Sequence, residues 1–276
     1  MQEMNTQYGS YKPNALKQSV IGLTRTLPNN WFGKRLGFTL RKLVHGKNRL
    51  PIDTDVFGLN LRLHGYDNKC EKRVVCLPQM FDPEERHVLE TAARAKGKDF
   101  NFIDLGANVG LYSLFMASLK LPNTKIIAIE ADPYIYQRLR FNIDNNNLDI
   151  QAFNMAVSDT DGTITLNINP KNRGENSIIH AQGDGEKIDV KCQTLLSIMD
   201  TQNMKQADAI KLDLEGAEET VLTSFFAHAP KSRLPKLILI ENAPERWESD
   251  IYALIEQQGY NLHFANKSNR VYTLKK

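Results

Sequence analysis

The sequence predicts an α/β domain built on a mostly parallel β-sheet with helices on both faces. From Phe100 onward, short apolar stretches alternate regularly with longer segments of helical periodicity. A Gly-rich turn separates the first strand of this series from the first helix. Near the end of the chain, two strand patterns are separated only by the four residues NKSN, which are too few for a parallel crossover.

The expected elements follow one another as strand–helix pairs. Each strand is a short, mainly apolar run, and each helix carries apolar residues three or four positions apart. The expected strands are 101–104, 125–130, 150–154, 209–213, 236–241, 260–265 and 270–274, and the expected helices are 110–119, 133–145, 216–226 and 247–258. Five parallel strands and a terminal antiparallel hairpin make a seven-stranded sheet, which is the layout of a Rossmann-like fold. Two further strands, TITLNI and KIDVKC, are expected in the excursion before residue 209.

The turn after the first strand has the pattern D-x-G-x-N-x-G, formed by Asp104, Gly106, Asn108 and Gly110. Glycines allow the chain to turn sharply and allow a ligand to approach the backbone. Glu130, at the end of the next strand, is placed to accept hydrogen bonds from both hydroxyls of a ribose. This order of elements indicates a nucleotide-type pocket.

The residues in the turn distinguish between ligands. A dinucleotide site has a middle glycine that makes room for a pyrophosphate, and Asn108 lies near that position here. Asp104 places an anion that would repel a pyrophosphate but suits an ammonium or a sulfonium group. S-adenosylmethionine carries both groups and a ribose. We therefore expect a methyl-donor pocket. A nicotinamide-dependent oxidoreductase and an ordinary strand-to-helix turn are the alternatives.

Four sequence blocks resemble the FkbM family of S-adenosylmethionine-dependent methyltransferases, and the resemblance extends from about residue 55 to residue 274. The blocks are FIDLGANVGLYS (102–113), AIEADP (128–133), FNMAVSDTDG (153–162) and IKLDLEGAEETVL (210–222). The resemblance implies a Rossmann-like class I methyltransferase fold and S-adenosylmethionine as cofactor. It also implies O-methylation of a hydroxyl on a sugar, glycolipid or other secondary metabolite. An N- or carboxyl-methyltransferase and a non-catalytic nucleoside-binding scaffold remain alternatives.

The donor contacts are expected at the carboxyl ends of the strands, where ligands bind in open α/β sheets. After the third strand, Ser158 or Asp159 could accept the adenine amino group, although SDTDG is also an ordinary turn sequence. The predicted donor-binding residues are Asp104, Gly106, Ala107, Asn108, Gly110, Glu130, Ala131, Ala156, Val157, Ser158, Asp159 and Asp213.

The fourth block is where we expect the chemistry. Asp213 and Glu215 follow one strand, and Glu241 and Asn242 end the next, so the four side chains should converge. One carboxylate could be a general base, because crowded carboxylates raise one another's pKa. Alternatively, Asp213, Glu241 and Asn242 could hold a divalent cation, as in the similar layout of catechol-type O-methyltransferases. This interpretation is not favoured, because Glu241 replaces an Asp and Gly216 replaces a lysine.

The polar segment between residues 161 and 197 is expected to lie over the pocket and to contact the substrate. Its Asn-, Gly- and Ser-rich part matches a substrate-facing region of the family. His180 could act as the base because of its near-neutral reference pKa, or it could be a solvated loop histidine. The substrate candidates are Asn172, Arg173, Asn176, Ser177 and Asn242.

Composition limits the other functions. With 276 residues, of which 41% are hydrophobic, the chain can bury a full core. No apolar run approaches the roughly 18 residues that span a membrane, and no secretory leader is recognised. Three cysteines without metal-ligand spacing are typical of a reducing compartment, so we expect a cytoplasmic protein. DLEG stands where many nucleic-acid amino-methylating enzymes carry an aromatic tetrapeptide. We therefore expect a small-molecule, glycan or lipid acceptor and no nucleic acid.

The net charge of +3 conceals a basic N-terminal extension, residues 1–54, before the methyltransferase domain, residues 55–276. From residue 4 to residue 52 there are nine Lys or Arg and no Asp or Glu. The extension is expected to be partly helical, with a start that could be disordered.

Within the extension, apolar residues recur at helical spacing with basic residues between them; they are Phe32, Leu36, Leu40 and Leu43. Such a helix could lie peripherally on an anionic membrane or bind an acidic substrate through residues 12–49. The alternative is a helix that packs on the domain and covers its active site.

Overall fold

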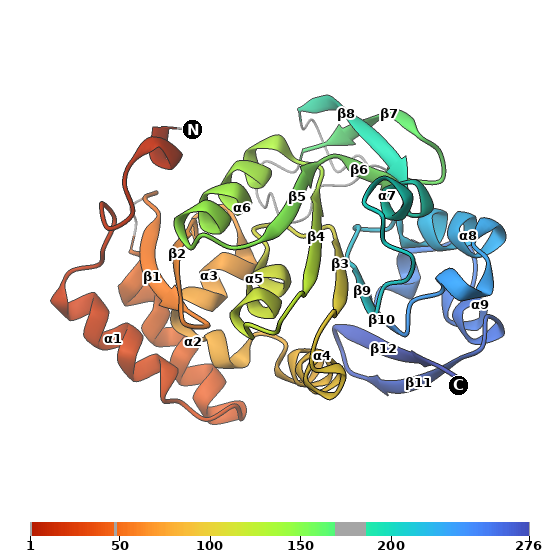
Figure 1. Cartoon of the computed structure of the whole chain (residues 1–276). Coiled ribbons are helices and arrows are strands. Elements are labelled where there is room, and N and C mark those ends of the chain that lie inside the picture. Colours follow the sequence, from red (N-terminus) through yellow and green to blue (C-terminus); the bar gives the residue numbers. More distant parts are fainter. Residues whose placement is uncertain (1, 47–48, 169–185, 276) are drawn as a thin grey trace.

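The computed structural model describes residues 2–46, 49–168 and 186–275 and is centred on one large sheet (Figure 1). Its strands are β3 (Asn101–Leu105), β4 (Lys125–Glu130), β5 (Ile150–Asn154), β9 (Ala209–Leu212), β10 (Leu237–Glu241), β11 (Tyr260–Ala265) and β12 (Asn269–Leu274). They form a seven-stranded sheet in the order β11-β12-β10-β9-β3-β4-β5. Strand β12 lies between β10 and β11 and runs in the opposite direction to the other six strands of the sheet. The predicted fold class is confirmed: the chain forms a mostly parallel, Rossmann-like sheet with a terminal antiparallel hairpin strand.

Helices cover both faces of this sheet, because alternate residues of each buried strand point to opposite sides. On β3, Phe102 belongs to one apolar cluster and Ile103 to the other. The first face carries α4 (Pro83–Lys96), α5 (Leu111–Ser118) and α6 (Pro133–Asn145), and the second carries α7 (Leu195–Thr201), α8 (Glu218–His228) and α9 (Ile251–Gln257). Figure 1 shows α5 and α6 on one side of the sheet and α8 and α9 on the other.

Two helices begin later than the sequence predicts. The segment before α8 is a turn in which Glu215 and Gly216 have positive φ angles of 53° and 110°. The buried Glu218 carboxylate accepts hydrogen bonds from the backbone N–H groups of Leu214 and Gly216. These bonds stabilise the turn, and α8 begins only after it, at Glu218. The expected helix 247–258 begins at Ile251, after a 3₁₀ turn over Pro244–Arg246.

The excursion after β5 forms a second, three-stranded sheet. It consists of β6 (Ala156–Ser158), β7 (Gly162–Asn167) and β8 (Lys187–Thr194), in the order β6-β8-β7. The strands expected in TITLNI and KIDVKC are confirmed as β7 and β8. The three-residue strand β6 was not predicted, because so short a run shows no alternation. Residues 169–185 lie outside the described part of the chain.

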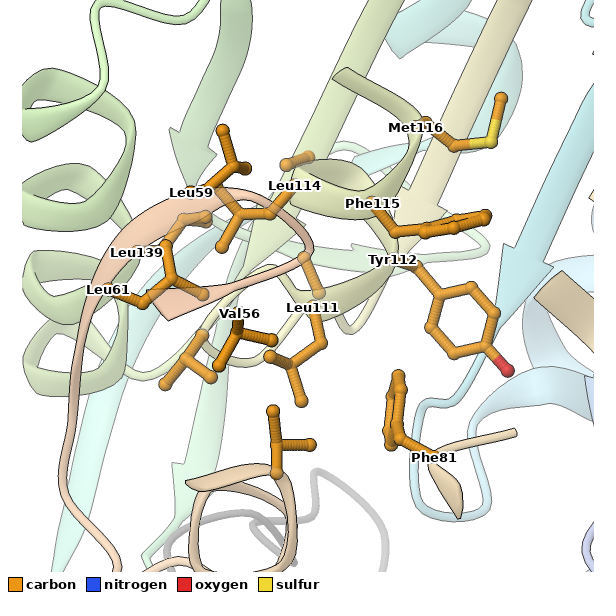
Figure 2. Close-up of a cluster of buried hydrophobic side chains, with 14 of the residues drawn as sticks. Val56, Leu59, Leu61, Phe81, Leu111, Tyr112, Leu114, Phe115, Met116 and Leu139 are labelled. Atoms are coloured by element: carbon orange, nitrogen blue, oxygen red, sulfur yellow. The ribbon is translucent and has the colours of Figure 1, made fainter. Parts of the chain in front are cut away.

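The N-terminal part of the chain packs against the first face of the sheet. It contains a 3₁₀ turn (Gln2–Asn5), α1 (Ala15–Arg25), α2 (Trp31–His45), the hairpin β1 (Ile52–Val56) and β2 (Leu59–Leu63), and α3 (Lys69–Cys76). Figure 2 shows hairpin residues such as Val56 and Leu61 beside Leu111 of α5 and Leu139 of α6. The boundary expected between residues 54 and 55 falls inside β1, and the division into two parts stays a prediction.

Arg62 ties the start of the chain to this hairpin. Its guanidinium donates to both carboxylate oxygens of Asp53, at 2.7 and 2.9 Å, and to the carbonyl oxygens of Thr6 and Gln7, both at 2.9 Å. Arg62 is 0% exposed and Asp53 is 2% exposed, so the ion pair is removed from solvent. The segment around Thr6 and Gln7 is therefore fixed by a buried charge.

Over the residues described, the helices are too short or too polar to cross a lipid bilayer.

We predict that Asp53→Asn destabilises the protein by about 3–5 kcal/mol, because it leaves the buried Arg62 without a counter-ion. The free energy of unfolding in urea measures the effect. The matched control is Asp144→Asn, which removes an exposed carboxylate paired with Arg140 one helical turn away. That variant should cost less than about 0.5 kcal/mol. Equal losses in the two variants would contradict the importance of the buried pair.

Candidate active site

The turn after β3 is shaped by its close approach to the turn after β9. Gly106 has a φ of 71°, and a Cβ on it would lie 1.9 Å from the carbonyl oxygen of Asp213. No residue but glycine can occupy this position. Asn108 also has a positive φ, 53°, which asparagine tolerates, and its side-chain oxygen accepts a hydrogen bond from the N–H of Val109 at 2.8 Å. The loop backbone is thus set in one conformation.

Glu130, at the end of β4, is fixed by backbone donors. Its carboxylate accepts a hydrogen bond from the N–H of Asn108 at 2.7 Å and one from the N–H of Asp132 at 2.8 Å. Each oxygen uses one of its two acceptor positions in this way, so each keeps one for a ligand. Burial raises the pKa of Glu130 to about 7, and the nearby Asp132 and Asp104 contribute in the same direction.

These two turns and the strand edge beside them enclose a pocket with about 620 Å³ of space, part of it open to solvent. Its walls are mostly apolar on the β5–β6 side, and its charges come from three carboxylates. The lining residues are Gly106, Asn108, Ile129, Glu130, Ala131, Met155, Ala156, Val157, Leu166, Asp213, Leu214, Glu215 and Ala217. Of the predicted donor contacts, the wall includes Gly106, Asn108, Glu130, Ala131, Ala156, Val157 and Asp213.

The other predicted donor contacts lie off this wall. Asp104 is 1% exposed behind the loop, where its carboxylate accepts hydrogen bonds from the backbone N–H and the hydroxyl of Ser113. Ala107 donates its N–H to the carbonyl oxygen of Ile129. Gly110 is the N-cap residue of α5, and a Cβ there would lie 2.3 Å from Leu139 Cδ1. The anions on the pocket wall are therefore Glu130, Asp213 and Glu215, and not Asp104.

Ser158 and Asp159 also lie beside the pocket and not on it. Ser158 is 5% exposed and donates its hydroxyl to the Asp159 carboxylate at 3.1 Å. The carbonyl oxygen of Asp159 accepts a hydrogen bond from the hydroxyl of Ser224 on α8. The apolar wall at Met155 and Leu166 was missed, because the sequence does not reveal that β7 folds back over the strand edge.

Lys211 was not predicted as a site residue. It lies in β9 and is 6% exposed, and its ammonium is 3.0 Å from Asp213 Oδ2 and 4.0 Å from Asp104 Oδ1. Burial alone would lower the pKa of Lys211, but Asp213 and Asp104 hold it above its ordinary value. The sequence signal that could have identified Lys211 is a lysine inside an otherwise apolar strand, because buried lysines are almost always paired with an opposite charge.

The predicted catalytic carboxylates do meet, and an arginine lies among them. Arg246 Nη1 is 2.7 Å from Glu215 Oε2 and 2.7 Å from Glu241 Oε2. Burial, together with the negative charge of Asp213, raises the pKa of Glu241 to about 7. A carboxyl group with such a pKa can accept a proton near neutral pH.

The side chain of Asn242 makes hydrogen bonds within the fold. Its side-chain oxygen accepts a hydrogen bond from the Tyr252 hydroxyl at 2.7 Å, and its side-chain nitrogen donates to the carbonyl oxygen of Asn266 at 2.9 Å. Asn242 therefore holds the β11–β12 turn. Within the described residues, no group of three or more His, Cys, Asp and Glu side chains could hold a metal ion. His180 and the substrate candidates Asn172, Arg173, Asn176 and Ser177 lie outside the described residues.

A second cavity, with about 950 Å³ of space that is partly open to solvent, lies between α2, the start of α4 and the β11–β12 turn. Its wall includes Lys34, Phe38, Arg73 and Asp82. Asp82 has an unusual φ of 39°, and its carboxylate accepts a hydrogen bond from the Tyr112 hydroxyl at 2.9 Å. Burial raises the pKa of Asp82. Backbone strain of this kind is found often at functional sites.

Tyr112 connects this cavity to the first pocket. The Lys211 ammonium lies 5.1 Å from the centre of the Tyr112 ring and contacts Asp213, which lines the first pocket. A continuous set of polar side chains thus runs from Asp82 through Tyr112 and Lys211 to Asp213.

Solved structures to which this chain shows some similarity include two proteins of low sequence identity. One is described as a putative methyltransferase yhhF from Escherichia coli, with 16% identity, a TM-score of 0.40, and coverage of 70% of this chain and 86% of that one. The other is described as a putative caffeoyl-CoA O-methyltransferase from Staphylococcus aureus, with 14% identity, a TM-score of 0.43, and coverage of 70% and 84%.

Two curated relatives are more similar to this chain in sequence. Methyltransferase sdnD of Sordaria araneosa is 26% identical over 192 residues, which are 58% of this chain and 73% of that protein. Methyltransferase 1 of Beauveria bassiana is 25% identical over 145 residues, or 45% of this chain and 57% of that protein. The family described as the methyltransferase FkbM domain matches residues 104–262. This range includes the turns after β3 and β9, Glu130, and Arg246 with its partners Glu215 and Glu241. This match covers more than half of the chain, which therefore belongs to the FkbM family of methyltransferases.

Proposed function

We propose that this methyltransferase uses S-adenosylmethionine and methylates a hydroxyl on a sugar, glycolipid or other secondary metabolite. The observation that carries the proposal is the carboxylate of Glu130. Two backbone N–H groups hold it on the wall of a pocket that also contains Asp213 and Glu215.

The residues of the first pocket fit this donor. Ile129, Met155 and Val157 offer an apolar surface to the adenine ring, and Glu130 offers acceptors to the ribose hydroxyls. Asp213 and Glu215 make one part of the pocket anionic, which suits the ammonium and sulfonium groups. When bound, the donor supplies a methyl group on a positively charged sulfur that leaves as a neutral thioether. Much of the rate enhancement would then come from alignment of the acceptor oxygen with that carbon.

We assign the acceptor to the second cavity and the general base to Glu241. The pKa of Glu241, at about 7, is suited to removing a proton from a hydroxyl as the oxygen attacks. Asp213 forms an ion pair with Lys211, and Glu215 forms one with Arg246. Asp82 is one of three acidic side chains at the wall of the second cavity, with Glu84 and Glu85, and would position the acceptor.

The proposal includes no divalent cation at Asp213, Glu241 and Asn242. Arg246 already provides the positive charge beside Glu241, and the Asn242 amide is committed to the β11–β12 turn. We further propose a cytoplasmic location and a small-molecule, glycan or lipid acceptor, with no nucleic acid as partner. The basic segment 12–49 would contact an anionic membrane or an acidic substrate.

We predict that Glu130→Gln weakens binding of S-adenosylhomocysteine on the order of 10–100-fold, because it removes the charge from two ribose hydrogen bonds. The wild-type affinity should fall as the pH decreases from about 8 to about 6. Protonation of Glu130, with its pKa of about 7, then competes with the ribose donors. The affinity of Glu130→Gln should not follow this titration. Calorimetric titration, with NADH in parallel, measures both effects.

Glu90→Gln, a change at a surface carboxylate paired with Arg94, is the matched control and should bind as the wild type does. Tight binding of NADH, or equal affinity of Glu130→Gln and the wild type for S-adenosylhomocysteine, would overturn the assignment of the donor. If neither ligand binds to the wild type, the result would favour a non-catalytic scaffold over an active methyltransferase.

We predict that Glu241→Gln lowers kcat by about 10²–10⁴-fold, the usual effect of losing a general base, and changes donor affinity by less than about twofold. The assay is release of S-adenosylhomocysteine in the presence of a panel of hydroxylated sugars and glycolipids. The wild-type kcat/KM should rise as the pH increases through about 7, because the base must be deprotonated. Activity should persist in EDTA.

The exposed neighbour Glu245 provides the control variant Glu245→Gln, which should keep full activity. Full activity of Glu241→Gln would exclude Glu241 as the base. Turnover of amine or carboxylate acceptors alone would replace O-methylation by the N- or carboxyl-methyltransferase alternative.

A further inference from the structure

Exposed large apolar side chains are concentrated in one part of this protein. In the described residues, those with more than a third of their surface exposed are Leu16, Leu23, Trp31, Phe32, Phe38, Leu43, Leu50 and Leu262. All except Leu262 lie between residues 16 and 50. Trp31 is 71% exposed and Phe32 is 63% exposed, which is unusual for side chains of this size. Such a concentration indicates an interaction surface.

The packing of α2 explains why these side chains face outward. The helix contacts the rest of the protein through Gly33, Gly37 and Val44, which are buried. A Cβ on Gly37 would lie 2.6 Å from Leu77 Cδ2, so the glycine allows a close helix contact. The spacing of Phe32, Leu36, Leu40 and Leu43 left open whether this apolar face contacts a membrane or packs on the domain. In the structure Phe32 and Leu43 are exposed, and the glycine face is the buried one.

Basic side chains lie among the exposed aromatic ones. Lys34, Arg35 and Lys42 are exposed on α2, and the chain has no Asp or Glu from residue 4 to residue 52. The Arg35 guanidinium lies 5.5 Å from the centre of the Trp31 ring. Aromatic side chains favour the headgroup region of a bilayer, and each basic side chain near an anionic leaflet strengthens binding about fivefold. The charge of this surface complements anionic lipid.

We propose that α2 docks on an anionic lipid bilayer. Trp31, Phe32 and Leu43 enter the headgroup region, and Lys34, Arg35 and Lys42 contact the lipid charges. We name these six residues the docking face. Figure 1 shows α1 and α2 at the edge of the molecule, on the side away from the C-terminus.

The docking face is continuous with the second cavity. Lys34 and Phe38 line that cavity, and both lie one or two helical turns from Trp31 on the same helix. A lipid-linked acceptor could therefore pass from the bilayer into the cavity without leaving the protein surface. This link to the acceptor rests on the proposed function. Docking itself deepens the membrane contact proposed there for residues 12–49.

The test is co-sedimentation of the full chain with vesicles of phosphatidylcholine alone or with about 30% phosphatidylserine. We expect binding to the anionic vesicles only, and weaker binding as salt increases. Lys34→Ala/Arg35→Ala/Lys42→Ala should bind about 100-fold more weakly, from about fivefold for each charge. Trp31→Ala/Phe32→Ala should also lose binding. Leu262→Ala, at an exposed leucine on β11, is the control and should bind normally.

Tryptophan fluorescence gives an independent measurement, because the chain has only two tryptophans and Trp247 is 9% exposed. Anionic vesicles should shift the emission to shorter wavelength in the wild type and not in Trp31→Phe. Absence of binding to anionic vesicles, or unchanged binding in both multiple variants, would overturn the proposal. S-adenosylhomocysteine calorimetry without vesicles tests the donor pocket separately, so the failure of one proposal is distinguishable from the failure of the other.

Discussion

The close contact between the turns after β3 and β9 is the constraint on which the site depends. Gly106 leaves no room for a side chain against the Asp213 carbonyl oxygen, and the Asp213 N–H donates to the Leu105 carbonyl oxygen at 3.1 Å. Because of this contact, the Asn108 N–H meets the Glu130 carboxylate, while Asp213 and Glu215 are held on the same pocket wall. A larger side chain at position 106 would separate the two turns and open the pocket.

Charge compensation is the second organising principle. Carboxylates at the ends of β3, β9 and β10 would repel one another in a partly buried site. Lys211 lies between Asp104 and Asp213, and Arg246 lies between Glu215 and Glu241. Glu130 is stabilised differently, by two backbone N–H groups, and its pKa reaches about 7. Two carboxyl groups of the site, Glu130 and Glu241, thus have a pKa of about 7.

The N-terminal part of the chain contributes both to the core of the domain and to the surface around the second cavity. Its hairpin closes the apolar cluster over α5 and α6, and Arg62 with Asp53 fixes the start of the chain. Its helix α2 supplies Lys34 and Phe38 to the second cavity and leaves Trp31 and Phe32 in solvent. One segment therefore joins the stability of the domain, the wall of the proposed acceptor cavity and the docking face.

The sequence alone determined the alternation of strands and helices, the antiparallel hairpin, the Gly-rich turn with Glu130, and the family. These features depend on local periodicity and on residues close together in the chain. Only the tertiary structure placed Asp104 behind the loop and Leu166 on the pocket wall, and only it joined Arg246 to Glu215 and Glu241. It also showed that α2 packs through its glycines. Which face of an element is buried, and which charges pair across strands, depends on neighbours distant in sequence, whose positions no local pattern records.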